Sequence, residues 1–303
     1  MRIAFVNSEI HASGGILVPL EYIRGLRKKG IDAFMTVNPA GPDREHREKV
    51  MSHYTDVPLK HMDDLRDFTD EDVIIAIRWE QCEELERFKG RKIQFVQGND
   101  LAYSEDEEWR ARLKRWRNDP RWELIGVSTY CLKEWGRGTV IPNGIADRFF
   151  VDHNLERDID VLVEGNNETN KNIEEALDYA KSLGGKVVWL GRDTYPVEGV
   201  EVITNPSQDE IPKIYQRAKV FVKLSKSEGF CLPVLEAMAS GCRVVTRNMG
   251  GNDFCVYSGR EQNCVDIDAR TMNSPVLEKK GRETAERFRW DKSIQKLMDY
   301  VGC

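Results

Sequence analysis

The sequence lacks several features that would assign it to well-known classes of protein. Its seven cysteines are scattered and odd in number and form no C-x-x-C pair, which argues against a disulfide framework and favours reduced thiols. No apolar run approaches the length of a membrane span, and the N-terminal MRIAFVNSEI is typical of a strand rather than a signal peptide. Low-complexity segments and short-period repeats are also absent. We therefore expect a cytoplasmic protein.

Charge and ligand spacing exclude further classes. A formal net charge of −6 makes nucleic acid an unlikely partner. No group of residues has the spacing of a metal site, so the sequence predicts neither a metal nor another cofactor. What is present is 303 residues, 40% hydrophobic and 32% charged, which suffices for two domains with sizeable cores. Short apolar segments alternate with helical ones in both halves, indicating α/β architecture with parallel sheets.

The most informative stretch is KVFVKLSKSEGFCLPVLEAMASG, residues 219–241. Residues 220–224 form an apolar run typical of a buried parallel strand, and residues 225–229 supply a loop. A helix is expected from about Pro233, a residue that the first helical turn tolerates, and Gly241 ends it. The stretch therefore predicts a strand, a tight loop and a helix.

The start of this helix suits an anionic or polar ligand. The backbone N–H groups of Phe230, Cys231 and Leu232 lack helical partners and lie at the positive end of the helix, where phosphates bind. Glu236, one turn into the helix, would be repelled by an anion, so its natural partner is a neutral diol such as a ribose. Glu228, on the loop, would reach hydroxyls on the other side of the phosphate. The alternative is an ordinary surface helix with two solvated glutamates.

Two motifs in this order resemble family 4 glycosyltransferases. Glu228 and Glu236, with Gly229, Phe230 and Pro233 between them, resemble the E-x7-E signature, usually E-G-F-G-x-P-x-x-E. Earlier in the chain, V-I-P-N-G-I at residues 140–145 resembles the V-I-P-N-G-V-D segment of the domain boundary. The resemblance implies the GT-B fold, with two facing Rossmann-like domains, parallel sheets and a C-terminal helix that returns to the first domain.

This resemblance also implies a function for the protein and a separate role for each domain. The expected reaction is metal-independent, retaining transfer of a sugar from a nucleotide-diphosphate sugar to an acceptor hydroxyl. Residues 1–150, with the returning helix at about 288–303, would form the acceptor domain, and residues 151–287 the donor domain. The acceptor is a sugar, a lipid-linked molecule or a polymer. A non-catalytic nucleotide-sugar-binding protein and a GT-B epimerase or phosphorylase stay open as alternatives.

The candidate site residues follow in part from that resemblance and in part from their places at strand ends and at the helix start. Glu228 would orient the donor sugar and Lys171 would neutralise the diphosphate, so these two are the expected catalytic residues. The expected substrate-binding residues are Gly14, Gly15, Asn99, Asn166, Arg192, Phe230, Cys231, Leu232 and Glu236.

Two of the departures from the family pattern bear directly on the sugar and the phosphate. Cys231 stands where the family usually has glycine, so its thiol takes up room beside the sugar. Asn166 replaces the arginine of a G-R-x-x-x-x-K-N pattern, which removes a cation from the phosphate site. Either the missing positive charge comes from elsewhere, with Arg192 and Arg78 both candidates, or the site works with less positive charge.

Residues 105–122, EDEEWRARLKRWRNDPRW, have two interpretations. Acidic residues open the segment and basic ones follow, which suits the helix dipole, and Trp109, Leu113 and Trp116 fall on one face. The basic residues around them are Arg110, Arg112, Lys114, Arg115 and Arg117. One interpretation is a solvated helix docked through its tryptophans. The other is a basic surface that binds an anionic acceptor, with peripheral membrane contact through residues 109–122.

Overall fold

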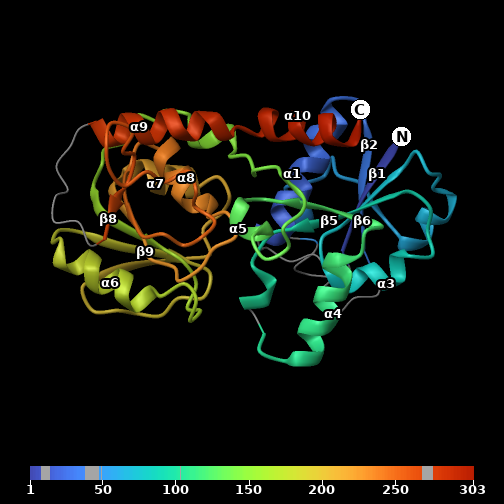
Figure 1. Ribbon diagram of the computed structural model, residues 1–303. Coiled ribbons are helices and arrows are strands. Elements are labelled where there is room, and N and C mark those ends of the chain that lie inside the picture. The colour runs from blue at the N-terminus through green and yellow to red at the C-terminus, as the bar shows by residue number, and fades with distance from the viewer. Residues whose placement is uncertain (8–13, 38–47, 49, 103, 268–275) are drawn as a thin grey trace. The chain divides into compact units, whose positions relative to one another are not determined.

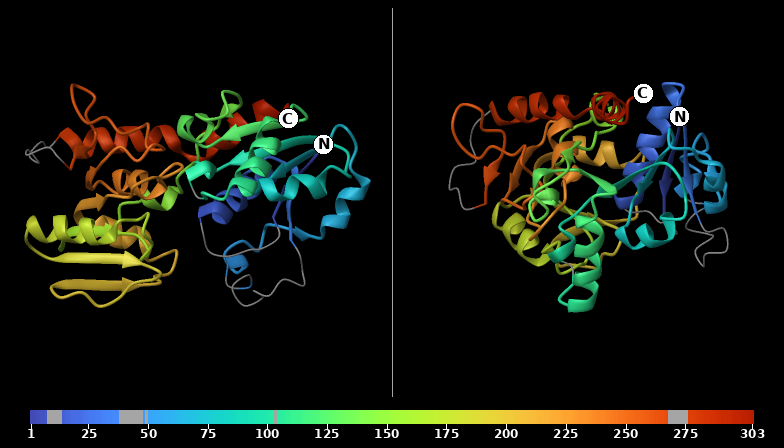
Figure 2. Two further views of the ribbon diagram at one scale, coloured as in Figure 1. Left: turned by 60° about the horizontal axis from the view of Figure 1, so that its bottom comes forward. Right: turned by 45° about the vertical axis from the view of Figure 1, so that its right-hand side comes forward.

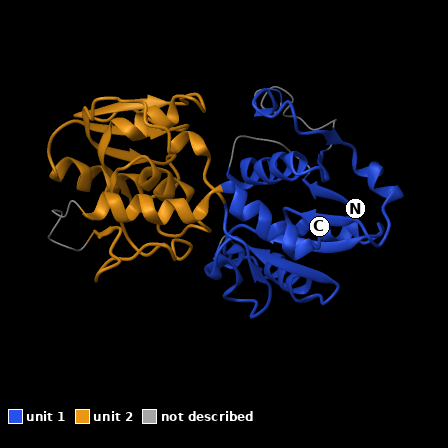
Figure 3. Ribbon diagram, turned by 90° about the horizontal axis from the view of Figure 1, so that it is seen from above, with its two compact units in different colours: residues 1–143, 290–303 blue, residues 144–289 orange. Residues whose placement is uncertain are grey.

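The computed structural model describes residues 1–7, 14–37, 48, 50–102, 104–267 and 276–303 of the chain. It divides into two compact units: unit 1 is Met1–Asn143 with Trp290–Cys303, and unit 2 is Gly144–Arg289 (Figure 3). Each unit is built on one parallel sheet with helices packed against it (Figures 1 and 2). Both chain ends belong to unit 1.

The sheet of unit 1 has the strand order β3-β2-β1-β4-β5-β6-β7, and all neighbouring strands are parallel. Its strands are β1 (Arg2–Val6), β2 (Asp32–Thr36), β3 (Leu59–Lys60), β4 (Val73–Ala76), β5 (Arg91–Val96), β6 (Trp122–Gly126) and β7 (Thr139–Val140). The chain moves outward in opposite directions from β1 and β4. In open α/β sheets, ligands bind beyond the carboxyl ends of the strands at such a switch point.

Helices cover both faces of this sheet. They are α1 (Gly14–Lys28), α3 (Cys82–Leu85), α4 (Glu107–Asn118), α5 (Thr129–Leu132) and α10 (Trp290–Val301), with 3-10 turns η1 (Met62–Asp67), η2 (Trp79–Gln81) and η3 (Asp100–Ala102). On one face α1 and α10 lie side by side (Figure 1), and Tyr22 of α1 stacks on Phe5 and meets Trp290 edge-on at 5.1 Å between ring centroids. On the other face, Leu113 and Trp116 of α4 join a buried cluster with Trp122.

Helix α4 confirms that a helix lies within residues 105–122 and docks through its apolar face. Asp106 caps it by accepting a hydrogen bond from the N–H of Trp109 at 2.7 Å, and acidic residues follow in the first turn. The prediction that Arg117 is one of the basic residues around this apolar face was wrong. Arg117 is buried, because its guanidinium donates to Gln94 Oε1 at 2.7 Å and pairs with Asp100.

The sheet of unit 2 has the order β10-β9-β8-β11-β12-β13, again parallel throughout. Its strands are β8 (Ile159–Glu164), β9 (Val187–Gly191), β10 (Val200–Thr204), β11 (Ala218–Lys223), β12 (Arg243–Thr246) and β13 (Val265–Asp266). The chain runs outward from β8 through β9 and β10, and then returns to place β11 on the other side of β8. The switch point of unit 2 therefore lies between β8 and β11.

Unit 2 is covered by α6 (Ile173–Ser182), α7 (Ile211–Arg217), α8 (Leu232–Ala239) and α9 (Val276–Ala285), with 3-10 turns η4 (Asp147–Phe149) and η5 (Glu286–Phe288). Ile173 and Leu177 of α6 pack on alternate apolar residues of the central strands, among them Val163. Phe221 of β11 lies next to a residue that packs against α6. Its own ring stacks on Tyr215 of α7, with ring centroids 5.3 Å apart. Helices α8 and α9 lie side by side (Figure 1).

One boundary differs from that expected. The returning helix expected at about residues 288–303 is α10, which begins at Trp290 after a 3-10 turn that separates it from α9. The first unit ends at Asn143 rather than at residue 150, because Phe149 packs edge-on against Tyr215 and Phe150 lies under the guanidinium of Arg289. The sequence also predicts a polar loop at residues 7–15 and a less regular region at about residues 38–72, and parts of both lie outside the described residues.

Candidate functional site

The carboxyl edge of the unit 2 sheet carries a buried ion pair at its switch point. Glu164 ends β8 and Lys223 ends β11, each directly after the paired residues Val163 and Val222. The Lys223 side chain is only 2% exposed, and its Nζ donates to Glu164 Oε2 at 2.6 Å and to the Glu164 carbonyl oxygen at 3.0 Å. A lysine this deeply buried requires charged or polar partners. The pair therefore places two opposite charges at the sheet edge where such sheets bind ligands.

The two residues expected to be catalytic lie in contact beside this pair. Lys171 Nζ donates to Glu228 Oε1 at 2.9 Å, and Lys223 Nζ lies 3.9 Å from the same oxygen. Burial disfavours the charged form of Glu228, but the two lysines outweigh it and hold the pKa of this carboxyl below its usual value. Glu228 is thus an ionised carboxylate held between two ammonium groups.

Two asparagines position Lys171. Asn170 Nδ2 donates to the carbonyl oxygen of Ser227 at 2.7 Å, and Asn172 Nδ2 donates to that of Leu224 at 3.2 Å. These bonds tie the loop after β8 to the loop after β11. Asn172 also has a φ of +54°, a left-handed conformation that asparagine tolerates. The loop thereby holds Lys171 against Glu228.

The start of α6 corrects one expectation of the sequence. The sequence predicts a helix from Lys171 to about Leu183, but α6 begins at Ile173 after the left-handed Asn172. Lys171 therefore lies in the preceding turn, where its N–H donates to the carbonyl oxygen of Glu168 at 2.8 Å. In that turn its side chain is free to cross to the neighbouring loop.

Asn166 has a structural task at the edge of this site. Its Oδ1 accepts the backbone N–H of Arg192 at 2.9 Å, and its Nδ2 donates to Glu168 at 3.2 Å. It therefore brings the backbone of Arg192 close without supplying charge, while the Arg192 residue itself is exposed. Arg78, the other expected source of charge, belongs to unit 1. The cation that sequence reasoning missed is Lys223, whose signal was a lysine inside the apolar run VFVKL.

Close backbone contacts fix the position of Glu228. Its N–H donates to the carbonyl oxygen of Met249 at 2.9 Å, and its carbonyl oxygen accepts from Gly251 at 3.0 Å. A Cβ on Gly251 would lie 2.1 Å from the carbonyl oxygen of Gly229, a distance that only glycine permits. The loop at residues 249–251 thus sets the path of the chain around Glu228.

The N-terminus of α8 leaves backbone donors available. Within the described chain, the N–H groups of Phe230, Cys231 and Leu232 donate to no protein acceptor. Cys231, the residue before the helix, has a φ of +53°, a conformation that favours glycine. Its thiol is buried, and this burial raises the pKa of the Cys231 thiol well above its usual value. The Phe230 ring packs with Phe254 and Phe288, so the ring is committed to this apolar contact.

Glu236 and Arg148 form the other end of this candidate site. Burial raises the pKa of the Glu236 carboxyl to about 7, with Glu164 adding to the shift and Arg148 and Lys223 opposing it. Among the described residues, no hydrogen bond to the Glu236 carboxylate is formed. Arg148 donates to Gln208 Oε1 at 2.9 Å, yet its buried Nε has no acceptor. Sequence reasoning missed Arg148, which follows the V-I-P-N-G-I segment closely.

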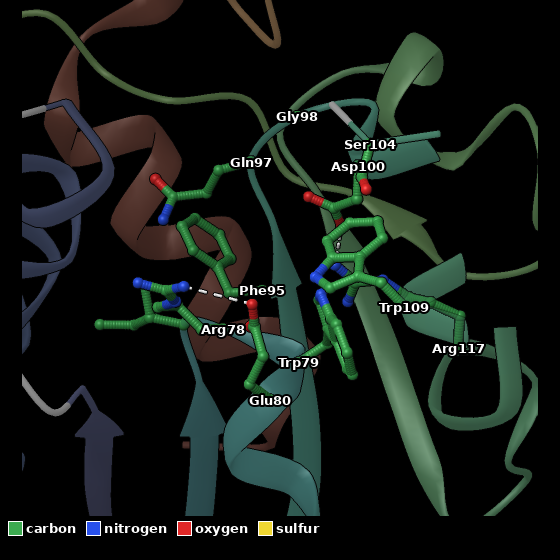
Figure 4. Close-up of a pocket in the computed structure, with 11 residues that line it drawn as sticks. Arg78, Trp79, Glu80, Phe95, Gln97, Gly98, Asp100, Ser104, Trp109 and Arg117 are labelled. Atoms are coloured by element: carbon green, nitrogen blue, oxygen red, sulfur yellow. Dashed lines mark hydrogen bonds and ion pairs between the residues drawn. The ribbon is translucent and has the colours of Figure 1, made fainter. Parts of the chain in front are cut away.

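The other expected binding residues lie in unit 1. Gly14 begins α1, and the carbonyl oxygen of Gly15 accepts from Gln97 Nε2 at 2.9 Å. Asn99 Nδ2 donates to the hydroxyl of Tyr130 at 3.4 Å. Beside them, a cavity of 480 Å³ opens at the carboxyl ends of β4 and β5 (Figure 4).

Several classes of feature are absent from the part of the chain that the structure describes. No group of three or more His, Cys, Asp or Glu side chains is placed to hold a metal ion. None of the described helices combines the length and apolar character needed to cross a membrane. All seven cysteines are free thiols.

Comparisons with known proteins agree with this architecture. Residues 149–271 match the family model of glycosyl transferases group 1. Sucrose-phosphate synthase from Thermosynechococcus elongatus is 17% identical with a TM-score of 0.73, and the alignment covers 99% of this chain and 98% of that one. HepE from Anabaena, solved with UDP and glucose, is 12% identical with a TM-score of 0.78, covering 100% and 99%.

A third solved structure extends the same likeness. The pneumococcal O-GlcNAc transferase GtfA, solved with UDP and GlcNAc, is 12% identical with a TM-score of 0.71, covering 100% and 98%. A search of curated protein sequences gives no match. The chain therefore has the two-domain, Rossmann-like GT-B fold, and its residues 149–271 resemble glycosyl transferases group 1 in sequence.

Proposed function

We propose that this protein is a glycosyltransferase that transfers a sugar from a nucleotide-diphosphate sugar. The observation that carries the proposal is the contact between Lys171 and Glu228 beside the unpartnered N–H groups that begin α8. The matched segment of glycosyl transferases group 1 contains these residues. Solved structures of similar fold contain UDP or UDP-glucose, which makes uridine nucleotides the first donors to test.

The leaving diphosphate determines what the site must do. It gains negative charge as the bond to the sugar breaks, and fixed positive groups lower that barrier. The Lys171 side chain is half-buried and its ammonium contacts Glu228. From this position the ammonium can turn to the phosphate and still lie close to the sugar that Glu228 holds. The N–H groups of Cys231 and Leu232 add partial positive charge from the helix start. Glu228 then orients the hydroxyls of the donor sugar.

Lys223 acts through Glu228. It is too deeply buried to touch a substrate, but it stays 3.9 Å from Glu228 Oε1 when Lys171 turns away. An ionised Glu228 accepts hydrogen bonds from sugar hydroxyls, whereas a protonated one loses part of that capacity. We therefore assign to Lys223 the role of a positioning residue that keeps Glu228 ionised.

Glu236 binds the ribose in this proposal. An ionised carboxylate offers acceptors to both hydroxyls of a diol, and the described residues leave the Glu236 oxygens uncommitted. Arg148 and Gln208 lie on the same side, where the nucleotide base would bind. The ribose thereby supplies the hydrogen bonds that the protein does not.

The reaction itself is proposed to be retaining and metal-independent. Lys171 and the helix N-terminus supply positive charge to the diphosphate, which is a task that a divalent cation performs in other transferases. The departing phosphate oxygen takes the proton of the acceptor hydroxyl, because it becomes basic as the bond to the sugar breaks. No further cofactor enters the proposal.

One observation favours a second candidate, a protein that binds a nucleotide sugar without turning it over. Asn166 holds the backbone of Arg192 instead of placing a cation at the phosphate, so the leaving group receives less stabilisation. Incubation with the donor alone separates the candidates. An enzyme slowly releases the nucleoside diphosphate by hydrolysis, whereas a binding protein returns the donor intact.

The test of the proposal is a melting-temperature screen against UDP-, GDP-, ADP- and TDP-sugars. A donor at one hundred times its dissociation constant stabilises the fold by about 2.7 kcal/mol. We expect at least one donor to shift the wild type, and the substitutions Lys171→Met and Glu236→Ala to abolish that shift. Glu198→Ala, at an exposed loop glutamate, serves as the control and keeps the shift. A screen in which no donor shifts the wild type contradicts the proposal.

A further inference from the structure

The cavity in unit 1 is built differently from the charged site of unit 2. It lies at the carboxyl ends of β4 and β5, and all the residues that line it belong to unit 1. Its volume of 480 Å³ falls within the range of about 300–1,000 Å³ that is typical of small-molecule sites. The cavity is therefore large enough for a ligand of one or two rings.

Aromatic side chains form its walls. Trp79 and Trp109 meet edge-to-face with ring centroids 5.3 Å apart, and Phe95 adds a third ring from β5. Trp109 is the most accessible of the three, since Trp79 and Phe95 are almost wholly buried. Figure 4 shows the Trp109 indole on one side of the cavity and the Arg78 guanidinium on the other, with the Glu80 carboxylate between them.

The charges in the cavity cancel. Arg78 pairs with Glu80 at 3.2 Å, and Arg117 pairs with Asp100 while also donating to Gln94. Two guanidinium groups thus meet two carboxylates, so the residues that line the cavity carry no net positive charge that would favour an anionic ligand. The Glu80 and Asp100 carboxylates would repel a phosphate or carboxylate placed between the walls. A neutral ligand avoids this repulsion.

The polar atoms of the cavity suit hydroxyl groups. Glu80 and Asp100 present carboxylate oxygens, which only accept hydrogen bonds. Gln97 donates through Nε2 to the Gly15 carbonyl oxygen, so its Oε1 is the atom left to accept from a ligand. A ligand that matches this set carries several O–H donors on an otherwise apolar ring.

We infer that this cavity binds a neutral sugar ring, with its C–H face against Trp109 and its hydroxyls on Glu80, Asp100 and Gln97. Aromatic walls with a few placed polar groups are the usual composition of a specific small-molecule site. The identification of this sugar as the acceptor rests on the proposed function, whereas the binding itself does not. The anionic acceptor considered for residues 109–122 is thereby disfavoured at this cavity.

The test measures sugar binding to the full chain in the absence of any nucleotide. Saturation-transfer NMR with methyl α-glucoside, methyl β-galactoside, N-acetylglucosamine and maltose reports on each neutral sugar directly. We expect at least one to bind, with an affinity at least tenfold lower in Trp109→Ala and Glu80→Gln. Arg115→Ala, on the exposed basic side of α4, is the matched control and binds like the wild type.

Further variants keep the test decisive. If Trp109→Ala does not fold, Trp109→Phe retains a ring and should bind within about threefold of the wild type, while Trp109→Leu should not. Lys171→Met, in unit 2, should leave sugar binding unchanged, so loss of the donor shift and loss of sugar binding are separate results. The inference is overturned if no neutral sugar binds, if Trp109→Ala binds as well as the wild type, or if glucose 6-phosphate or phosphatidylglycerol vesicles bind in place of neutral sugars.

Discussion

The pKa of Glu236 gives the sharpest stability prediction for unit 2. Burial, together with the nearby Glu164 carboxylate, raises the pKa of this carboxyl from 4.5 to about 7. The folded state therefore holds a proton on Glu236 that the unfolded state releases at a lower pH. The stabilisation from this proton is complete below pH 4.5 and is lost as the pH rises through 7.

The size of the effect follows from the two pKa values. The difference between 4.5 and about 7, at about 1.4 kcal/mol for each pH unit, corresponds to about 3.5 kcal/mol. Glutamine resembles the protonated carboxyl in shape and carries no charge at any pH. The substitution Glu236→Gln should therefore match the wild type most closely at acid pH and become the more stable protein above neutrality.

The assay is equilibrium urea unfolding of both proteins at pH 5 and at pH 8. The difference in unfolding free energy, variant minus wild type, should grow by roughly 2–3 kcal/mol between these two values. Taking the difference at each pH cancels the titration of all groups that the two proteins share. Unfolding of both units must be resolved as separate transitions or shown to coincide.

Glu228→Gln is the control with the opposite sign. Because its lysine neighbours hold the pKa of Glu228 below the usual value, its ionised form stabilises the fold above pH 4.5. Glu228→Gln should therefore be less stable than the wild type by a nearly constant amount from pH 5 to pH 8. An equal difference for Glu236→Gln at both pH values would refute the reasoning, because it would mean that Glu236 is ionised at pH 5 in the folded state.

Four further predictions follow from the same structure. Nucleotide affinity, measured by calorimetry, should rise as the pH increases from 5 through 7 and level off above pH 8, because the ribose hydroxyls donate to the ionised form of Glu236. Lys223→Met should lower the unfolding free energy by about 1–3 kcal/mol in urea, since it leaves the half-buried Glu164 carboxylate without its buried cation, and adding Glu164→Gln should restore part of it. Gly251→Ala should remove about 1–3 kcal/mol and the donor-dependent melting shift, because its Cβ would overlap a backbone oxygen. Arg117→Met should cost about 3 kcal/mol by leaving Asp100 without its cation, whereas Arg115→Ala should change the stability by less than about 0.5 kcal/mol.

The fold was largely predictable because its signals are local. Short apolar runs such as residues 3–6 and 220–224 indicated buried parallel strands, and the spacing of Trp109, Leu113 and Trp116 indicated a docked helix. The burial of Arg117 was not predictable, because its partners Gln94 and Asp100 lie in another part of the sequence. The start of α6 was not predictable either. It depends on the left-handed backbone of Asn172, a conformation that the residue type permits but does not require.

The candidate site was predictable only where a motif marks it. The spacing of Glu228 and Glu236 indicated a ligand at the start of α8, and the structure brings Lys171 to Glu228. Lys223 carries no motif, and its meaning depends on the pairing of β8 with β11, which places it beside Glu164. A lysine within an apolar strand is the signal that future sequence reasoning can use.

The most direct measurement for the central proposal is the release of nucleoside diphosphate from the donor that gives the largest melting shift. The wild type should release it without an added acceptor, and proton NMR should show that the sugar first appears with the anomeric configuration that it had in the donor. Lys171→Met should slow the release at least a hundredfold, which corresponds to about 2.7 kcal/mol in the barrier. A donor that binds tightly and is recovered intact after long incubation would contradict the assignment as a transferase.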